Sequence, residues 1–167
     1  MKTLYIIRHA KSSWDDMGID DFDRNLTERW KSDAKLIWKQ FRKKKIFPDK
    51  FFCSWAKRAE KTCKIISEEI DFDLEKVVYD NDLYDYHMKW VDFYLSYLMS
   101  IKDKHESVFL VWHNPSLSEL ANYLLWKDIW DIPTTGVVAI EFDVDSWKQI
   151  SHWNWELNFF IYPKMFK

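Results

Sequence analysis

Short apolar runs recur along the chain, and each is followed by a polar segment. The first of them, residues 3–7, is β-branched and apolar and ends abruptly at Arg8. Runs of this length and composition predict buried β-strands. We therefore expect strands at 3–7, 51–54, 76–79, 107–111 and 135–142, with one or two more within the aromatic segment 147–162.

Between these runs, apolar side chains recur three and four residues apart, which is the spacing of one face of an α-helix. Thr27 is a candidate N-cap for the first helix. The apolar positions are Trp30, Ala34, Ile37, Trp38 and Phe41, then Ala59, Cys63, Ile66 and Ile70, then Val91, Tyr94, Leu95, Leu98 and Met99, and finally Leu117, Leu120, Ala121, Leu124 and Leu125. Alternating strands and helices predict a three-layer α/β/α sandwich with a mostly parallel central sheet, in one domain covering 1–167.

Charged side chains stand where the predicted strands end. Arg8 and His9 follow the first strand, Arg58 comes just after the second, and His113 follows the fourth. The carboxyl ends of parallel strands meet at one edge of a sheet, so we expect these four side chains to lie close together. Two imidazoles and two guanidiniums suit a dianionic phosphoryl group, and a histidine can attack phosphorus directly.

Composition excludes several classes of function. The 167 residues carry a net charge of −2, which gives no electrostatic reason to expect binding to nucleic acid. No apolar run approaches the roughly 18 residues of a membrane span, so we expect no membrane partner. Cys53 and Cys63 lack the spacing of a zinc or redox motif, and we expect buried, reduced thiols in a cytoplasmic protein.

Several segments carry a resemblance to a known family. They are residues 4–14, 21–29, 54–62, 111–115, 120–124 and 133–136. In this order they resemble the histidine phosphatase superfamily, and within it the small SixA-like branch. The resemblance implies a phosphoglycerate-mutase-like fold without the long insertions of the larger mutases.

The resemblance also implies roles for individual residues. His9 would be the nucleophile that becomes phosphohistidine, Arg8 and Arg58 would bind the phosphoryl oxygens, and His113 would stabilise the pentavalent transition state. The further candidates for substrate binding within the matching segments are Ser12 and Asn114.

A proton must also reach the leaving group, and in much of the superfamily a carboxylic acid on the loop after the third strand supplies it. Asp82 and Asp85 lie on that loop, and we favour Asp85. A donor in the loop that contains Asp15 and Asp16 is an open alternative.

The resemblance implies a mechanism without a metal or another cofactor. A concentration of aspartates, Asp20, Asp21 and Asp23, invites a metal interpretation. Their segment lacks the glycine and the terminal glutamate of an EF-hand loop, so we expect no metal there.

Tryptophan is unusually frequent and glycine unusually rare. The chain has 11 Trp and 2 Gly, where average usage predicts roughly a dozen glycines. Trp30, Trp55 and Trp112 stand at family positions that normally hold small or turn residues. We expect strained backbone at such positions, and an indole of Trp112 beside the pocket that reduces activity. The alternative is that these positions have helical or extended dihedrals and that Trp simply packs on the surface.

Together these features predict a metal-independent phosphatase that acts on a phosphoester or on protein phosphohistidine through a phosphohistidine at His9. Its partner would be a phosphorylated small molecule or a phosphohistidine protein, and the sequence sets no oligomeric state. One alternative is a catalytically impaired module that binds phosphate or a phosphoprotein. A phosphoglycerate mutase is a weaker alternative, because the chain has no room for insertions that enclose a substrate.

Overall fold

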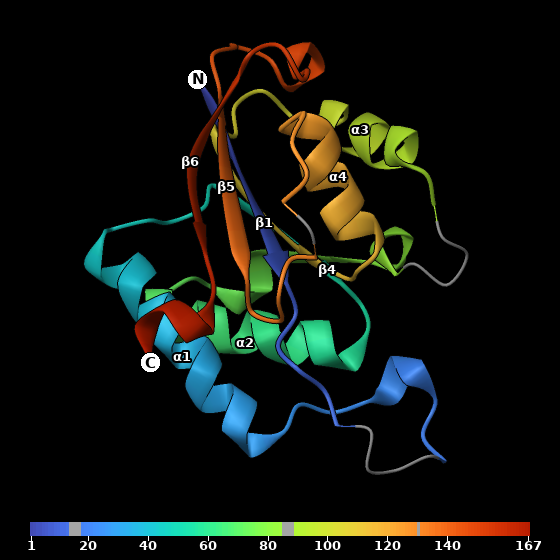
Figure 1. Cartoon of the computed structure of the whole chain (residues 1–167), viewed down its shortest axis with the longest axis vertical. Coiled ribbons are helices and arrows are strands. Elements are labelled where there is room, and N and C mark those ends of the chain that lie inside the picture. Colours follow the sequence, from blue (N-terminus) through green and yellow to red (C-terminus); the bar gives the residue numbers. More distant parts are fainter. Residues whose placement is uncertain (14–17, 85–88, 130) are drawn as a thin grey trace.

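The computed structural model describes residues 1–13, 18–84, 89–129 and 131–167, which form a sheet flanked by helices (Figure 1). The strands are β1 (Lys2–Arg8), β2 (Lys50–Ser54), β3 (Val77–Asp80), β4 (Ser107–Trp112), β5 (Val137–Phe142) and β6 (Trp155–Ile161). Their order in the sheet is β3-β2-β4-β1-β5-β6. The first four run parallel, whereas β5 is antiparallel to both of its neighbours. The expected mostly parallel sheet is confirmed, and the aromatic segment contributes the edge strand β6.

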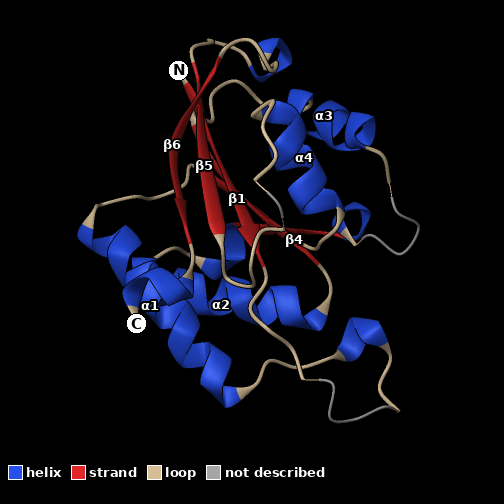
Figure 2. Ribbon diagram, in the orientation of Figure 1, coloured by secondary structure: helices blue, strands red, loops and turns tan. Residues whose placement is uncertain are grey.

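Helices cover both faces of the sheet (Figure 2). The helices α1 (Glu28–Lys43) and α2 (Lys57–Ile70) lie on one face, and α3 (Val91–Met99) and α4 (Ser116–Leu124) lie on the other. Alternation along β1 explains why each face is apolar, because successive side chains of a strand point to opposite sides. Leu4 and Ile6 pack with the side chains of α3 and α4, whereas Tyr5 and Ile7 pack with those of α1 and α2. The expected three-layer sandwich is therefore confirmed.

The N-terminus of α1 differs from the expectation. Thr27 occupies the N-cap position, but its side chain makes no capping hydrogen bond. Its hydroxyl is buried and has no partner among the residues that the structure describes. The prediction that Thr27 begins the helix holds, while the prediction of its capping bond is wrong.

A tight turn before β5 presses against the end of β1. The backbone N–H groups of Arg8 and Thr135 close it, the first donating to Gly136 O and the second to the carbonyls of Arg8 and His9. A Cβ on Gly136 would lie 2.7 Å from the carbonyl oxygen of Pro133, so this close approach requires glycine. The turn thereby fixes the backbone of Arg8, the last residue of β1, and of His9, the residue after it.

Most described tryptophans adopt ordinary backbone conformations. Among the described residues, Trp126 is the one tryptophan in the left-handed region, with φ of 43°. Trp30 lies in α1 and Trp112 lies in β4. The prediction of strained backbone at Trp30, Trp55 and Trp112 is therefore wrong, and Trp126 is the position where a glycine would relieve strain.

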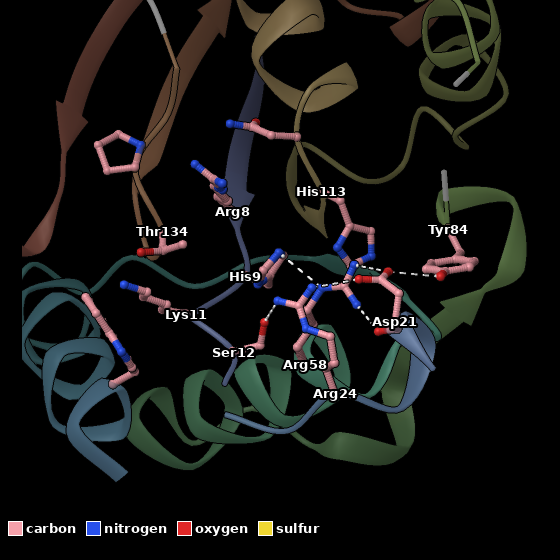
Figure 3. A pocket seen from close by; sticks show the side chains of 13 residues that line it. Arg8, His9, Lys11, Ser12, Asp21, Arg24, Arg58, Tyr84, His113 and Thr134 are labelled. Atoms are coloured by element: carbon pink, nitrogen blue, oxygen red, sulfur yellow. Dashed lines mark hydrogen bonds and ion pairs between the residues drawn. The ribbon is translucent and has the colours of Figure 1, made fainter. Parts of the chain in front are cut away.

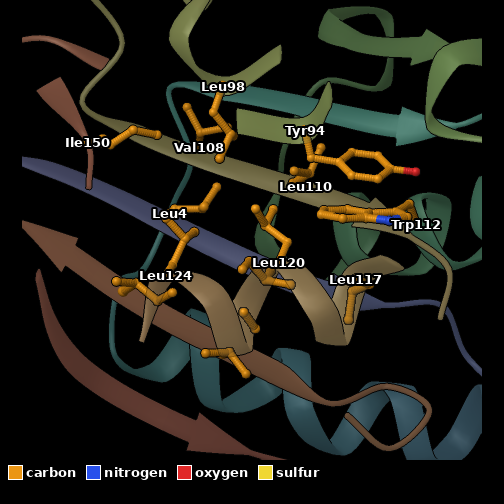
Figure 4. Packing of buried hydrophobic residues seen from close by; sticks show 14 of the residues in the cluster. Leu4, Tyr94, Leu98, Val108, Leu110, Trp112, Leu117, Leu120, Leu124 and Ile150 are labelled. Atoms are coloured by element: carbon orange, nitrogen blue, oxygen red, sulfur yellow. The ribbon is translucent and has the colours of Figure 1, made fainter. Parts of the chain in front are cut away.

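The side chain of Trp112 does not reach the pocket either. Its indole is fully buried on the α3 and α4 side of the sheet, stacked on Tyr94 with ring centroids 5.0 Å apart (Figure 4). Strand alternation is the cause, because Trp112 shares its face with Val108 and Leu110.

None of the described helices combines the length and apolar character that crossing a bilayer requires.

Candidate active site

A pocket of about 740 Å³ opens at the carboxyl ends of the parallel strands (Figure 3). In the register of β1 and β4, Arg8 lies opposite Trp112, so His9 and His113 follow at the same level of two adjacent strands. Arg58 reaches the pocket from the first turn of α2. The described residues that line it are Arg8, His9, Lys11, Ser12, Asp21, Arg24, Trp30, Arg58, Tyr84, His113, Asn114, Pro133 and Thr134. The sequence correctly predicted that the two histidines and two arginines meet.

The bonds of His9 define which nitrogen is free to react. Its Nδ1 lies 2.6 Å from the carbonyl oxygen of Ala10. A carbonyl can only accept, so Nδ1 carries the proton and Nε2 keeps its lone pair. Burial, followed by the nearby cation of Arg58, lowers the pKa of His9 to about 3, against the weaker opposing effect of the Ala10 bond. His9 is therefore neutral at physiological pH, with an unprotonated Nε2 in the pocket.

His113 lies beside His9, with 5.0 Å between the ring centroids. Its Nε2 is 2.8 Å from the hydroxyl of Ser54, at the end of β2. Nδ1 is buried without a partner among the described residues. Burial, then the proximity of His9 and Arg58, holds the pKa of His113 well below its usual value. If the Ser54 hydroxyl donates to Nε2, Nδ1–H is left to donate to an anion.

Arg58 connects His9 to a carboxylate on the opposite wall. Its Nε donates to Nε2 of His9 over 3.3 Å. Its terminal nitrogens donate to Asp21, one to the backbone carbonyl at 2.6 Å and the other to Oδ2 at 3.0 Å. Arg58 is 6% exposed, so this cation is desolvated and its contacts are strong ones.

Asp21 is the centre of a cluster that sequence reasoning missed. Its carboxylate also accepts from Nη1 of Arg24 at 2.8 Å and from the hydroxyl of Tyr84 at 3.1 Å. Burial acts to raise the pKa of Asp21, but Arg58, Tyr84 and Arg24 together lower it. The available signal was that Asp21 and Arg24 lie in a segment matching the family, where we considered Asp21 only as a metal ligand.

The other predicted substrate-binding residues are held by neighbours. Arg8 donates from Nη1 to the carbonyl of Ile132 at 2.6 Å, and Asn114 donates to the same oxygen at 3.3 Å. Ser12 accepts a hydrogen bond from Arg24. All three predicted residues line the pocket, with Arg8 and Asn114 on the side of the turn before β5.

The candidate proton donors differ in whether they line the pocket. Asp82 is 66% exposed, pairs with Lys89 at 2.9 Å and does not line the pocket. Asp85, like Asp15 and Asp16, lies outside the described residues. Among the described residues that line the pocket, Asp21 supplies the only carboxylate. Within the described ranges, no cluster of three or more His, Cys, Asp or Glu is arranged to hold a metal ion.

Comparison with known proteins gives similarities in sequence and in fold. Residues 4–92 match the histidine phosphatase superfamily (branch 1). A Hydrogenobacter thermophilus protein named "Putative phosphoserine phosphatase 2" is 33% identical over 114 residues, which are 67% of this chain and 53% of that protein. The chain thus spans about half the length of this relative.

Solved structures match over almost the whole chain. The "putative phosphohistidine phosphatase SixA from Agrobacterium tumefaciens" is 25% identical, with a TM-score of 0.80 over 96% of this chain and 97% of that one. A "protein histidine phosphatase SixA complexed with tungstate" has a TM-score of 0.84 at 18% identity, over 99% of each chain. The family match includes Arg8, His9 and Arg58 and covers more than half of the sequence. The chain therefore belongs to the histidine phosphatase superfamily, and it is similar to the SixA structures, with which it shares the phosphoglycerate-mutase-like fold.

Proposed function

We propose that this protein is a metal-independent phosphatase that works through a phosphohistidine on His9. The observation that carries the proposal is the unprotonated Nε2 of His9, which faces a pocket beside Arg58 and His113. The family and the phosphatase names of its relatives support the same activity. Desolvated cations and N–H donors can stabilise a phosphoryl transition state, which carries its charge on the equatorial oxygens.

The reaction would proceed in two displacements. In the first, the lone pair of His9 Nε2 forms a P–N bond while the bond from phosphorus to the leaving oxygen or nitrogen breaks. The leaving group takes up a proton. In the second, water attacks phosphorus, the P–N bond breaks, and inorganic phosphate and a proton leave.

The neighbouring side chains would share the binding of the phosphoryl group. Arg58 and Arg8 supply positive charge, and Nδ1 of His113 supplies a donor that has no described partner. Ser12 and Asn114 extend the binding surface. For the proton to the leaving group we keep Asp85 ahead of Asp82. The carboxylate of Asp21 lies in the pocket too, but its lowered pKa keeps it ionised, so it is not the proton donor.

The names of the relatives support a proposal for the substrate class. We propose a phosphoester or a protein phosphohistidine, because the similar solved structures carry the name of phosphohistidine phosphatases and the sequence relative carries that of a phosphoserine phosphatase. We place the protein in the cytoplasm, where its two buried free thiols would stay reduced.

A substrate panel with and without chelator tests this function. We expect release of inorganic phosphate from p-nitrophenyl phosphate and from a phosphohistidine protein, at rates that EDTA leaves unchanged. Binding of inorganic phosphate without turnover of any substrate would instead support a binding module. Interconversion of phosphoglycerates with a bisphosphoglycerate primer would support a mutase, and loss of activity in EDTA that a divalent ion restores would contradict the metal-free mechanism.

A further inference from the structure

We propose that Thr62 is a positioning residue whose buried hydroxyl holds the backbone of Ala10 so that His9 keeps its proton on Nδ1. This inference rests on the proposed role of His9 as nucleophile. Thr62 lies in α2, is fully buried and does not line the pocket, so it acts through other residues.

The hydroxyl of Thr62 bridges two segments that are far apart in sequence. It donates to the carbonyl of Arg58 at 2.7 Å and accepts from the N–H of Ala10 at 2.9 Å. A hydroxyl has one proton, and Thr62 donates it in the hydrogen bond to the Arg58 carbonyl. In the second bond the Ala10 N–H therefore donates to the hydroxyl oxygen of Thr62. The Arg58 carbonyl is thus the acceptor of one bond, and the Ala10 N–H is the donor of the other.

The bridge controls the acceptor that sets the tautomer of His9. Ala10 is fully buried, and its carbonyl receives the Nδ1 proton at 2.6 Å. Its N–H, on the other side of the same Cα, is bonded to Thr62. The Thr62 bond therefore restrains the backbone of Ala10, and with it the carbonyl that keeps Nε2 of His9 unprotonated.

The same hydroxyl also restrains the residue that faces Nε2. Thr62 is one helical turn after Arg58, and a bond from a threonine to the carbonyl four residues earlier is common in helices. Thr62 differs from such a threonine because its hydroxyl also accepts a hydrogen bond from the N–H of Ala10, in a distant segment. Because Arg58 donates from Nε to His9 Nε2, one buried hydroxyl is tied to the backbone on both sides of that contact.

Removing the hydroxyl while keeping the side-chain shape isolates this role. Thr62→Val leaves the Ala10 N–H buried without its acceptor, and we expect the backbone to shift to regain one. Thr62→Ala removes the hydroxyl without risk of a steric clash, and Thr62→Ser keeps it. Ser67→Ala is the matched control, since Ser67 is a buried hydroxyl of the same helix with no described partner.

The test combines ¹⁵N NMR of the histidine rings with steady-state kinetics and Tm. In the wild-type protein and in Thr62→Ser and Ser67→Ala, we expect His9 to show a protonated Nδ1 and an unprotonated Nε2. In Thr62→Val and Thr62→Ala we expect a mixture of tautomers, and kcat lower by roughly ten- to a hundredfold as for a misplaced reactive group. KM should stay close to that of the wild type.

Two results would overturn the proposal. One is a wild-type His9 tautomer in whichever of Thr62→Val and Thr62→Ala folds, even if Tm falls, because that would reduce Thr62 to a packing residue. The other is the same loss of kcat in Ser67→Ala. A wild-type protein without phosphatase activity would contradict the proposed function alone, since the tautomer is measured without substrate.

Discussion

The Nε of Arg58 donates to Nε2 of His9 over 3.3 Å, so the lone pair of the proposed nucleophile already accepts a hydrogen bond from a buried cation. A phosphoryl group that approaches Nε2 must also approach Arg58. The cation can then pass its hydrogen bonds from the imidazole and Asp21 to the phosphoryl oxygens, without the pocket being rebuilt.

Arg58→Ala should lower kcat/KM by an amount equivalent to about 2–4 kcal/mol of transition-state stabilisation, as for removal of a preorganised donor. Arg58→Lys keeps the charge but loses the planar set of donors, so we expect it to recover only a small part of the loss. Kinetics on p-nitrophenyl phosphate measure both. An Arg58→Ala enzyme as active as the wild type would show that Arg58 does not contact the transferred group.

Asp21→Asn should strengthen the binding of inorganic phosphate. The Asp21 carboxylate bonds to Arg58, to Arg24 and to Tyr84, and so competes with an anion for the same donors. Its side chain is 47% exposed, so we expect a gain of only about two- to fivefold. Calorimetry at fixed ionic strength measures it.

Asp23→Asn is the control for this change, because it removes the same charge from the same short 3-10 helix, Asp21–Asp23, outside the pocket lining. It should leave the phosphate affinity close to that of the wild type. Weaker binding in Asp21→Asn would mean that the carboxylate mainly holds Arg58 in place.

Trp112→Gly should destabilise the protein without raising its activity. The sequence led us to expect the opposite, but the indole fills the core between β4 and α3 rather than the pocket. Its loss should cost about 3–5 kcal/mol of unfolding free energy, as for other large-to-small core changes. Urea unfolding measures this, and Trp112→Phe should cost less. Faster turnover in Trp112→Gly at unchanged stability would restore the original expectation.

Stability should fall as pH decreases from 7 to 5. The folded-state pKa of His9 is lowered to about 3, while an unfolded histidine titrates near 6.5. Below pH 6.5, His9 therefore binds a proton in the unfolded chain but not in the folded protein. At pH 5 this difference lowers the free energy of unfolding by about 2 kcal/mol. The pKa of His113 is shifted in the same direction.

Urea unfolding at the two pH values measures the effect, and His9→Gln should show a smaller difference between them. Equal pH dependence in the wild type and His9→Gln would mean that His9 is not held neutral by the fold.

Much of the fold could be predicted from the sequence because most of its strands are short and largely apolar and its helices have clear apolar faces. The meeting of His9 and His113 followed from the same pattern, since both come directly after parallel strands. The sequence also contained enough information to place the side chain of Trp112. This residue is two positions from Leu110 and four from Val108 in one strand, so it must share their face of the sheet.

The Asp21 cluster could not be predicted in the same way. Asp21, Arg24 and Tyr84 come from segments without a hydrophobic period, and Tyr84 is separated from Asp21 by 63 residues. Their contacts depend on how those segments fold across the strand ends, which side-chain spacing does not encode. The Thr62 bridge was hidden for a related reason, since the bond reaches a backbone N–H and not a side chain.

The central claim is that His9 carries the phosphoryl group, and trapping the intermediate tests it most directly. After rapid acid-free quenching of turnover, peptide mass spectrometry and ³¹P NMR should find an acid-labile, base-stable phosphoryl group on Nε2 of His9. The label should be absent in His9→Asn, while the phosphate affinity of that variant shows that its pocket is intact. A phosphoryl group that persists in His9→Asn, or turnover by that variant at the wild-type rate, would contradict the account.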